Sequence, residues 1–382
     1  STIKKLGTNM LVTLIFLLFT IAVVAFHFYA LEQGFWFPVL ASNWALMDLT
    51  TKITLAFSAV VFIVISVFVC YCIFRFRRRE GHRADHEPEN SKENSKLEGW
   101  LTIFTTVGVI ALLSPGLMVY RDFINPPADA IKAEVLGEQW TWSYRFPGND
   151  GIYGRTNPKF FSLENSFGLD PLDPASQDDV LVNTNTVHFP INQPVDIQLR
   201  SKDVLHDFYI PQFRAKIDMV PGQVTKLWFE PTLEGEYEIV CAEYCGIAHY
   251  NMRGVAIVNS VPDFQFWLDQ QQTFGEFQQQ AASSSGGVTD KDGELIARTK
   301  GCIACHSIDG KPGIGPSWKG IAGEDRVLVG GGSVIANDLY LKRSITNPND
   351  EVVLGYAPMM PPYPLSEEEL DAIVEYINSL GE

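Results

Sequence analysis

The sequence is poor in cysteine and in basic residues, and each shortage excludes a class of protein. Six cysteines among 382 residues are far fewer than a small secreted scaffold stapled by disulfides contains. The 29 Lys and Arg residues are outnumbered by 45 Asp and Glu residues, which gives a net charge of −16. Because binding to nucleic acid needs a basic face, we exclude a nucleic-acid partner. An acidic surface is instead compatible with a basic protein partner.

Long apolar runs are confined to the first third of the chain. They span about residues 10–30, 53–74 and 100–120, and each has roughly the 20 residues that a helix needs to cross a bilayer. The sequence therefore predicts three transmembrane helices in a membrane region of residues 1–128, with lipid as a partner. A signal peptide is the alternative for the first run, but that run is long and no small-x-small cleavage site follows closely.

The distribution of positive charge predicts how these helices are oriented. Residues 75–99 contain seven Lys or Arg, whereas residues 31–51 contain none. By the positive-inside rule the loop after the second run is cytoplasmic, and Lys4 and Lys5 place the N-terminus on the same side. We therefore expect a multi-pass protein of a bacterial inner membrane, with everything after the third run in the periplasm.

The rest of the chain divides into two modules by composition. Residues 129–262 contain short β-rich stretches separated by Gly, Pro and Asp, which indicates a β-sandwich or barrel. Within them, the polar stretch 147–179 is typical of a long surface excursion. We expect a helix at about residues 262–280 and a flexible linker at 281–287, and we assign residues 263–288 to this connecting segment. Residues 289–382 form a small helical module, whose last helix begins with a capping box.

The helical module contains the attachment signature of a c-type haem. Cys302, Cys305 and His306 form the pattern C-x-x-C-H. Two cysteines at this spacing can each add to a haem vinyl group, while the adjacent histidine directs its ring at the iron. A thioredoxin-like dithiol has the same Cys spacing but needs a βαβ context, which is absent here. The motif therefore predicts covalent haem c.

The sixth position on the iron calls for a thioether, which raises the potential of a haem. Met359 and Met360 lie just before the last predicted helix. This region resembles the methionine loop of bacterial class I cytochromes c, in which the ligand directly precedes a proline. The resemblance covers nearly all of residues 289–382 and implies an all-α class I cytochrome c domain. It favours Met360 over Met359, and it implies that the Pro316 carbonyl accepts a hydrogen bond from His306.

A second cluster of metal-binding side chains lies in the β-rich module. Cys241, Cys245, His249 and Met252 fall within twelve residues. Thiolate, imidazole and thioether form the ligand set of copper electron-transfer sites. A structural zinc site is one alternative, but zinc has no use for a thioether. A disulfide is another, and it would leave the histidine and the methionine unexplained.

These residues, together with His206 in Asp-Val-Leu-His, resemble the dinuclear CuA centre of cytochrome c oxidase subunit II. The likeness implies a cupredoxin-like β-sandwich or barrel. It further implies bridging of two copper ions by Cys241 and Cys245, one ligand to each ion from His206 and His249, a weak ligand from Met252, and a backbone carbonyl ligand from Glu243. The side chain of Glu243 would also reach a magnesium ion at the interface with the catalytic subunit.

Other segments extend the resemblance, and two depart from it. Trp140, in an aromatic stretch, corresponds to the family's electron-entry residue, and residues 216–222 correspond to a segment that faces the catalytic subunit. The second and third apolar runs correspond to the family's two-helix hairpin, so the first run is additional. Glu98 resembles a carboxylate at a cytoplasmic proton entrance, although the usual tryptophan three residues later is displaced to Trp100. A glutamate at a helix end is otherwise simply solvated.

The resemblance implies the electron-entry subunit of a respiratory terminal oxidase of the haem-copper type with a fused cytochrome c. Electrons would come from cytochrome c or a quinol-oxidising complex, pass through haem c and CuA, and reach oxidase subunit I and the other oxidase subunits. The predicted helices lack the histidines that oxygen chemistry needs, so that chemistry belongs to the partner. Two alternatives stay open, namely the CuA subunit of a nitric oxide reductase and a membrane-tethered copper-delivery protein.

Overall fold

The computed structural model describes most of the chain, in two compact units. The described residues are 2–35, 37–76, 81, 91–162, 165–283, 290–311, 313–363 and 365–381. The first unit consists of residues 1–40 and 44–124, and the second consists of residues 41–43 and 125–382. The short segment 41–43 belongs to the second unit because its backbone bonds to that unit. Ala41 N–H donates to Gln212 O (2.8 Å) and Asn43 N–H donates to Glu230 O (3.1 Å).

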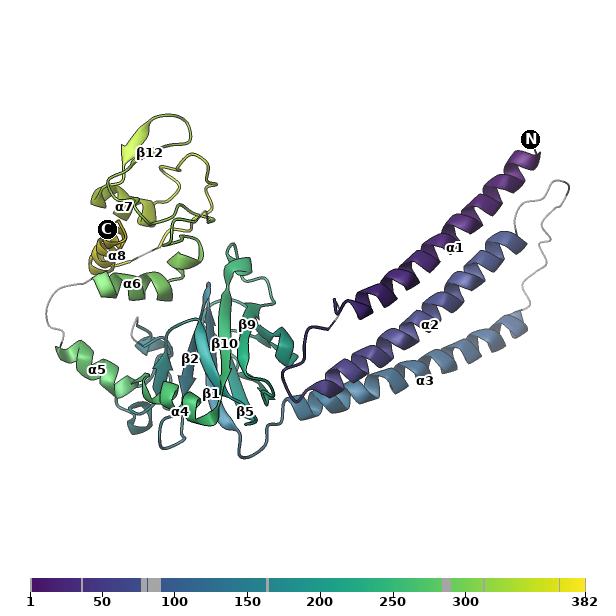
Figure 1. Cartoon of the computed structure of the whole chain (residues 1–382), viewed down its shortest axis with the longest axis horizontal. Coiled ribbons are helices and arrows are strands. Elements are labelled where there is room, and N and C mark those ends of the chain that lie inside the picture. The colour runs from purple at the N-terminus through teal and green to yellow at the C-terminus, as the bar shows by residue number, and fades with distance from the viewer. Residues whose placement is uncertain are drawn as a thin grey trace. The chain divides into compact units, whose positions relative to one another are not determined.

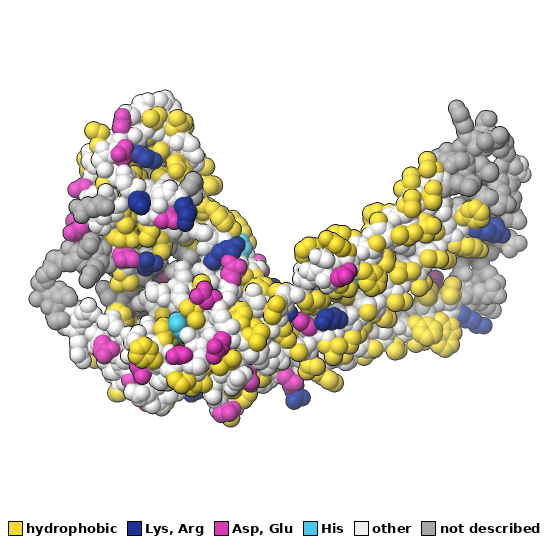
Figure 2. Space-filling model, viewed as in Figure 1, with side chains coloured by type: hydrophobic (Ala, Val, Ile, Leu, Met, Phe, Trp, Pro, Cys, Tyr) yellow, Lys and Arg dark blue, Asp and Glu magenta, His cyan; other side chains and the backbone are white. Residues whose placement is uncertain are grey.

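Three long helices make up the first unit: α1 (Thr2–Glu32), α2 (Ala45–Arg75) and α3 (Ser91–Phe123) (Figure 1). Each is long and apolar enough to cross a membrane, which agrees with the three predicted spans. Hydrophobic side chains cover much of their outer surface (Figure 2). Such exposure is unfavourable in water and suits a lipid environment. Part of the basic loop that gave the predicted orientation, including Arg77–Arg79, lies outside the described residues.

The second unit begins with a β-sandwich, as the sequence predicts. One sheet has the order β11-β3-β2-β1-β5-β8 and the other has the order β4-β10-β9-β6-β7. The strands are β1 (Ile131–Glu138), β2 (Thr141–Phe146), β3 (Val180–Val182), β4 (Thr186–Pro190), β5 (Val195–Ser201), β6 (His206–Ile210), β7 (Ala215–Met219), β8 (Thr225–Phe229), β9 (Gly235–Cys241), β10 (Arg253–Asn259) and β11 (Gln272–Thr273). Alternate residues of β5 and β10 are buried, the period expected when one face of a strand packs on a core.

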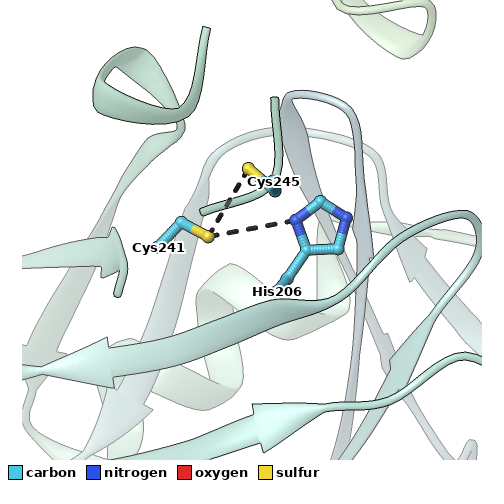
Figure 3. Close-up of side chains that lie close together, drawn as sticks. All are labelled: His206, Cys241 and Cys245. Atoms are coloured by element: carbon cyan, nitrogen blue, oxygen red, sulfur yellow. Dashed lines mark hydrogen bonds between the residues drawn. The ribbon is translucent and has the colours of Figure 1, made fainter. Parts of the chain in front are cut away.

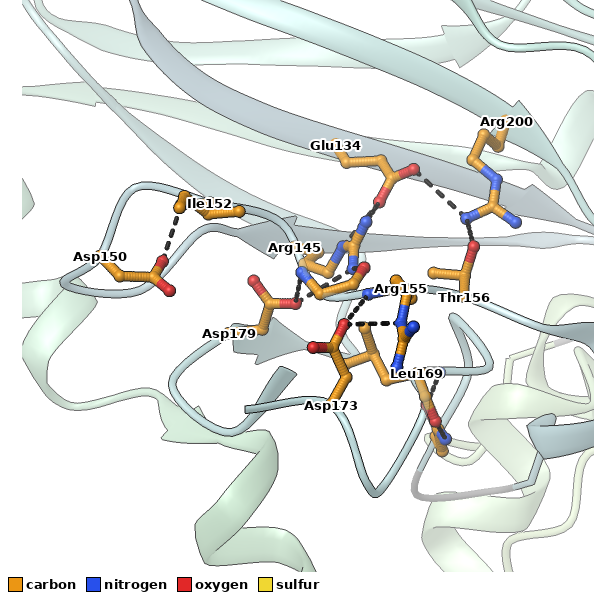
Figure 4. A network of polar contacts seen from close by, with 12 residues as sticks. Glu134, Arg145, Asp150, Ile152, Arg155, Thr156, Leu169, Asp173, Asp179 and Arg200 are labelled. Atoms are coloured by element: carbon orange, nitrogen blue, oxygen red, sulfur yellow. Dashed lines mark hydrogen bonds and ion pairs between the residues drawn. The ribbon is translucent and has the colours of Figure 1, made fainter. Parts of the chain in front are cut away.

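The prediction that residues 147–179 form a surface excursion is wrong in part. The side chain of Asp179 is fully buried, and so are those of Phe167 and Leu169. Arg145 of β2 anchors this stretch to the sandwich (Figure 4). Its guanidinium donates to Glu134 of β1 (2.6 Å), and within the stretch it donates to the Gly154 carbonyl (3.0 Å) and to Asp179 (3.1 Å). A buried charge needs such paired partners, so composition alone missed the role of this stretch.

The prediction of one helix at residues 262–280 is also wrong. The structure has α4 (Val261–Asp269), then the short strand β11, then α5 (Phe274–Ser283). The break allows β11 to extend the first sheet by pairing with β3. The predicted linker begins as the end of α5, and its residues from 284 onward lie outside the described residues.

The C-terminal module consists of α6 (Asp290–Thr299), α7 (Asp338–Thr346), α8 (Glu367–Ser379) and the hairpin of β12 (Asp325–Val327) and β13 (Ser333–Ile335) (Figure 1). The predicted capping box is present, with Ser366 and Glu369 each bonding the other's backbone N–H. Helices α6 and α8 cross closely at Gly293, which has no side chain. A Cβ at this position would lie only 2.0 Å from the Ala372 carbonyl oxygen. The helical prediction for this module is therefore confirmed.

Candidate copper and haem sites

The six residues predicted to hold copper converge at one end of the sandwich. His206 begins β6 and Cys241 ends β9. The loop that follows carries Glu243, Cys245 and the 3₁₀ turn His249–Asn251, and Met252 lies at the end of this turn, directly before β10. Rigid neighbouring strands thus hold both ends of the ligand-bearing loop, which favours a fixed geometry.

The two thiols lie at the centre of this cluster. Cys241 Sγ is 3.7 Å from Cys245 Sγ, well beyond a disulfide bond of about 2.05 Å. Figure 3 shows the two sulfur atoms beside the His206 ring, whose Nδ1 lies 3.9 Å from Cys241 Sγ. On the other side, Cys245 Sγ lies 3.6 Å from His249 Nδ1 and 3.8 Å from Met252 Sδ. The Glu243 carbonyl oxygen is 3.1 Å from Cys241 Sγ.

The electrostatics of the thiol pair favour a bound cation. Hydrogen bonding from Cys245, helped by His206, lowers the pKa of the Cys241 thiol well below its ordinary value. The same pairing, together with burial, raises the pKa of Cys245 above the ordinary range. One thiolate therefore forms readily, while a second negative charge in a buried site needs positive charge beside it. Metal binding supplies such charge and deprotonates a coordinating thiol. The donors therefore fit a soft metal ion.

A second layer of residues holds these ligands, and the sequence analysis missed it. Asp203 Oδ1 accepts from His206 Nε2 at 2.8 Å. Asp203 Oδ2 accepts from the Gln139 backbone N–H at 2.7 Å, while the Gln139 side chain donates to the Cys245 carbonyl oxygen at 2.7 Å. Carboxylates that bond a metal-binding histidine fix its ring and raise its basicity. The three-residue spacing of Asp203 and His206 was a usable signal, whereas nothing in the sequence marked Gln139.

The hydrogen bond between His206 and Asp203 shifts the pKa values of both residues. Burial alone would lower the pKa of His206, but its bonds to Asp203 and Cys241 raise it above the usual value. Burial alone would raise the pKa of Asp203, but bonds from His206 and from two backbone N–H groups lower it. The pair therefore favours a carboxylate next to an electron-rich imidazole.

Trp140 lies beside the ligand-bearing loop, in the turn between β1 and β2. It is 6% exposed, and its Nε1 is buried without a hydrogen-bond partner. The loop approaches closely at Gly246, since a Cβ there would lie 3.1 Å from the Trp140 ring. Gly246 has φ of +127°, a conformation that glycine adopts without strain. The structure thus brings Trp140 next to the cluster.

The C-terminal module contains a largely apolar cavity around the C-x-x-C-H motif. Cys302 lies in the 3₁₀ turn Cys302–Ala304, and Cys305 and His306 follow directly. All three residues line the cavity together with Met359 and Met360. The cavity also has walls of Ile314, Trp318, Ile321, Tyr340, Leu341, Ile345, Val352, Val353, Tyr363 and Ile377. An apolar pocket with two thiols and an imidazole is chemically suited to a haem.

The His306 ring is held for iron binding. Its Nδ1 lies 2.8 Å from the Pro316 carbonyl oxygen, the contact that the cytochrome resemblance implies. Burial lowers the pKa of His306 below its usual value, and this hydrogen bond opposes the shift. A neutral ring whose Nδ1–H is bonded to a carbonyl leaves Nε2 as the ligand atom. Both Met359 and Met360 line the cavity, so the structure keeps the choice of methionine open.

The structure does not bring every predicted site residue to a site. Glu98 is an exposed residue of α3, where its backbone carbonyl accepts from Thr102 Oγ1 at 2.8 Å. Among the described residues, one group of three potential metal ligands lies within reach of a single ion: His206, Cys241 and Cys245. The magnesium ion expected at the Glu243 side chain therefore has no further support.

Comparisons with known proteins agree with both sites. Residues 130–261 match the family described as "Cytochrome C oxidase subunit II, periplasmic domain", and residues 291–381 match "Cytochrome c". The alternative cytochrome c oxidase subunit 2 of Bradyrhizobium diazoefficiens is 47% identical over 69% of this chain and 93% of its own length. The cytochrome c oxidase subunit 2 of Alkalihalophilus pseudofirmus is 26% identical over 84% of this chain and 83% of its own.

Similar chains are also found among solved structures. The periplasmic domain of subunit II of the cytochrome oxidase of Bradyrhizobium japonicum is 26% identical, and the match covers 38% of this chain and 95% of that one, with a TM-score of 0.28.

Proposed function

Because the chain belongs to the cytochrome c oxidase subunit II family and carries a C-terminal cytochrome c domain, we propose that it is the electron-entry subunit of a haem-copper terminal oxidase. It takes electrons from cytochrome c or a quinol-oxidising complex and delivers them to the catalytic subunit, which reduces oxygen to water. When bound, haem c and paired copper each accept and release one electron with a low reorganisation energy.

The convergence of four further ligand-type residues on two facing thiols carries this proposal. We propose Cys241 and Cys245 as bridging ligands of CuA, with His206, His249, Met252 and the Glu243 carbonyl completing the set. The two sulfur atoms are flanked by an imidazole on each side at 3.6–3.9 Å. Strand ends and the second layer hold these donors in place, so little needs to move when the charge changes.

Haem c is proposed to attach at Cys302 and Cys305, with His306 and Met360 as axial ligands. The cavity that would hold it lies in the same compact unit as the sandwich, and Trp140 and Ile247 of the sandwich contribute to its wall. We therefore propose Trp140 as the residue through which electrons pass from the haem to the copper ligands. The contact of Trp140 with Gly246, next to Cys245, supports this path.

The oxygen chemistry belongs to a partner subunit. Along α1, α2 and α3 the sequence contains a single histidine, His27, whereas haem a and a haem-copper pair need several axial and metal-binding histidines. We propose that the helices hold the chain beside oxidase subunit I and the other oxidase subunits, with the sandwich in the periplasm. We also propose that the N-terminus is cytoplasmic and that residues 129–262 and 289–382 act as the two redox modules.

Metal analysis and magnetic resonance of the purified complex test the assignment. We expect two copper ions and one covalent haem per chain, and an unpaired electron shared between two copper nuclei. A single exchangeable copper ion would instead indicate the copper-delivery function, and a lone zinc ion would contradict the proposal. Identifying the largest co-purifying subunit and its haems separates an oxygen-reducing complex from a nitric oxide reductase.

A further inference from the structure

The ring of His306 is confined on three sides, and only one of the three is the carbonyl contact already described. At the edge, Nδ1 bonds the Pro316 carbonyl oxygen. On one side lies Gly315, where a Cβ would come within 2.5 Å of His306 Cε1. Against the ring face lies the indole of Trp318, with ring centroids 5.2 Å apart and planes inclined by 21°.

Trp318 is itself firmly held. Its side chain is 5% exposed, and its backbone N–H donates to the Ser307 carbonyl oxygen at 2.8 Å. Its indole and the ring of Tyr376 in α8 pack in a T-shaped arrangement, at 6.3 Å between centroids and 83° between planes. Tyr376 lies at the close crossing of α6 and α8, since a Cβ on Gly293 of α6 would be 2.6 Å from Tyr376 Cβ. The α6–α8 crossing therefore holds Tyr376 in place, and Tyr376 packs against Trp318.

A single hydrogen bond at Nδ1 leaves an imidazole free to rock about the bond's axis. A flat aromatic face in near-parallel contact blocks that motion, because rocking would drive one ring into the other. The orientation of an axial imidazole affects the electronic structure of the iron that it binds, and outer partners of metal-binding histidines commonly set that orientation. Trp318 is placed to do so.

We propose that Trp318 is a positioning residue that fixes the plane of the His306 imidazole on the haem iron. It transmits the rigidity of the α6–α8 crossing, through Tyr376, to the axial ligand. This inference rests on the proposed attachment of haem at Cys302 and Cys305, and it adds a role that the ligand motif does not contain.

The test compares Trp318→Leu with Trp318→Phe in the full chain within its purified complex. The leucine variant keeps an apolar side chain without a ring face, and the phenylalanine variant keeps the face. We expect one narrow low-spin resonance from the oxidised haem of the wild type and of the phenylalanine variant. The leucine variant should give a broadened or second resonance and a redox titration broader than a single one-electron curve. A single narrow resonance and a single titration curve in the leucine variant would overturn the inference.

Two controls separate positioning from folding. Haem staining on a denaturing gel reports covalent attachment, and a leucine variant that fails to attach haem is replaced by Tyr376→Leu, for which we expect the same broadening to a smaller extent. A Tyr376→Leu resonance as narrow as that of the wild type would then overturn the inference. Absence of covalent haem from the wild type would instead refute the proposed function itself.

The sandwich offers a matched histidine–tryptophan stack. Trp267 of α4 lies on His188 of β4 with ring centroids 4.4 Å apart and planes inclined by 12°. Trp267→Leu removes an equivalent stack away from the haem cavity, so we expect the haem resonance to keep the width of the wild type. Broadening in this variant equal to that in Trp318→Leu would show that any loss of an indole stacked on a histidine disturbs the haem, and would overturn the inference.

Discussion

The two redox sites of this chain are built in opposite ways. At the copper site, each donor atom from β6, β9 and the following loop lies within 4 Å of one of the two cysteine sulfur atoms, and His206 and Met252 are fully buried. At the haem site, the donors line a cavity that a large cofactor must fill, and Met360, the proposed ligand, is only partly buried. A small ion needs side chains that meet, whereas a covalent macrocycle needs side chains that surround it.

This difference predicts that the copper site depends on each bridging atom. In Cys245→Ser we expect loss of the shared-electron copper signal and a fall in electron delivery of more than about 100-fold, since even loss of an outer partner can cost 10–100-fold. Copper analysis and turnover with reduced cytochrome c measure both effects. Cys72→Ser, at a half-buried thiol in α2, is the matched control and should behave like the wild type. Full copper content in Cys245→Ser would contradict the proposal that Cys245 is a copper ligand.

The haem site should tolerate loss of one axial ligand because two thioether bonds still hold the cofactor. In Met360→Leu we expect haem to stay attached while its midpoint potential falls by about 0.1 V or more, because a thioether ligand raises the potential. Met359→Leu is the control on the adjacent residue and should leave the potential unchanged. Redox titration of both variants decides the ligand, and a fall confined to Met359→Leu would assign it to Met359 instead.

The second layer of the copper site should have a smaller effect than its ligands. Asp203→Asn replaces a charged acceptor of the His206 bond with a neutral one, so we expect copper affinity to fall about 10-fold. Competition with a chelator measures the change. Glu238→Gln, which weakens an exposed ion pair with Arg253, should leave the affinity unaltered. If Asp203→Asn and Glu238→Gln had equal copper affinities, Asp203 would have no role in holding the copper ligands.

The smallest expected effect is on the pH dependence of stability, and it arises from Asp179, which lies outside both metal sites. Burial raises the pKa of Asp179 to about 7, against the opposing influence of Arg145. A raised pKa in the folded state means that the folded chain binds the proton more tightly than the unfolded chain. This contribution to stability is complete below about pH 4 and is lost as the pH rises towards 7.

Asp179→Asn cannot titrate, so it should flatten the pH dependence of unfolding between about pH 4 and 7. Thermal unfolding of the sandwich, followed by near-ultraviolet circular dichroism, measures the slope. Asp150→Asn alters an exposed carboxylate of the same insertion and is the control. An unchanged slope in Asp179→Asn would show that Arg145 keeps Asp179 ionised throughout this range.

The copper loop and the haem motif were readable from sequence because their ligands are close along the chain. Cys241, Cys245, His249 and Met252 fall within one loop, and Cys302, Cys305 and His306 within one turn. Short spacing makes these two motifs recognisable from the order of residues, whereas the distant His206 and Met360 were identified only through the resemblance to known families. The predicted helix at 262–280 failed for the opposite reason, because the pairing of β11 with β3 is a long-range contact that overrides local propensity.

By itself, the sequence determined the three apolar spans, the β-rich and helical modules and the candidate metal-binding motifs, because periodicity and motif spacing are properties of neighbouring residues. Tertiary structure alone placed Gln139 behind the copper ligands, Trp318 on the face of His306 and Arg145 at the centre of the buried insertion. Each of these contacts joins residues from different elements or loops, and only the packing of those elements decides which side chains meet.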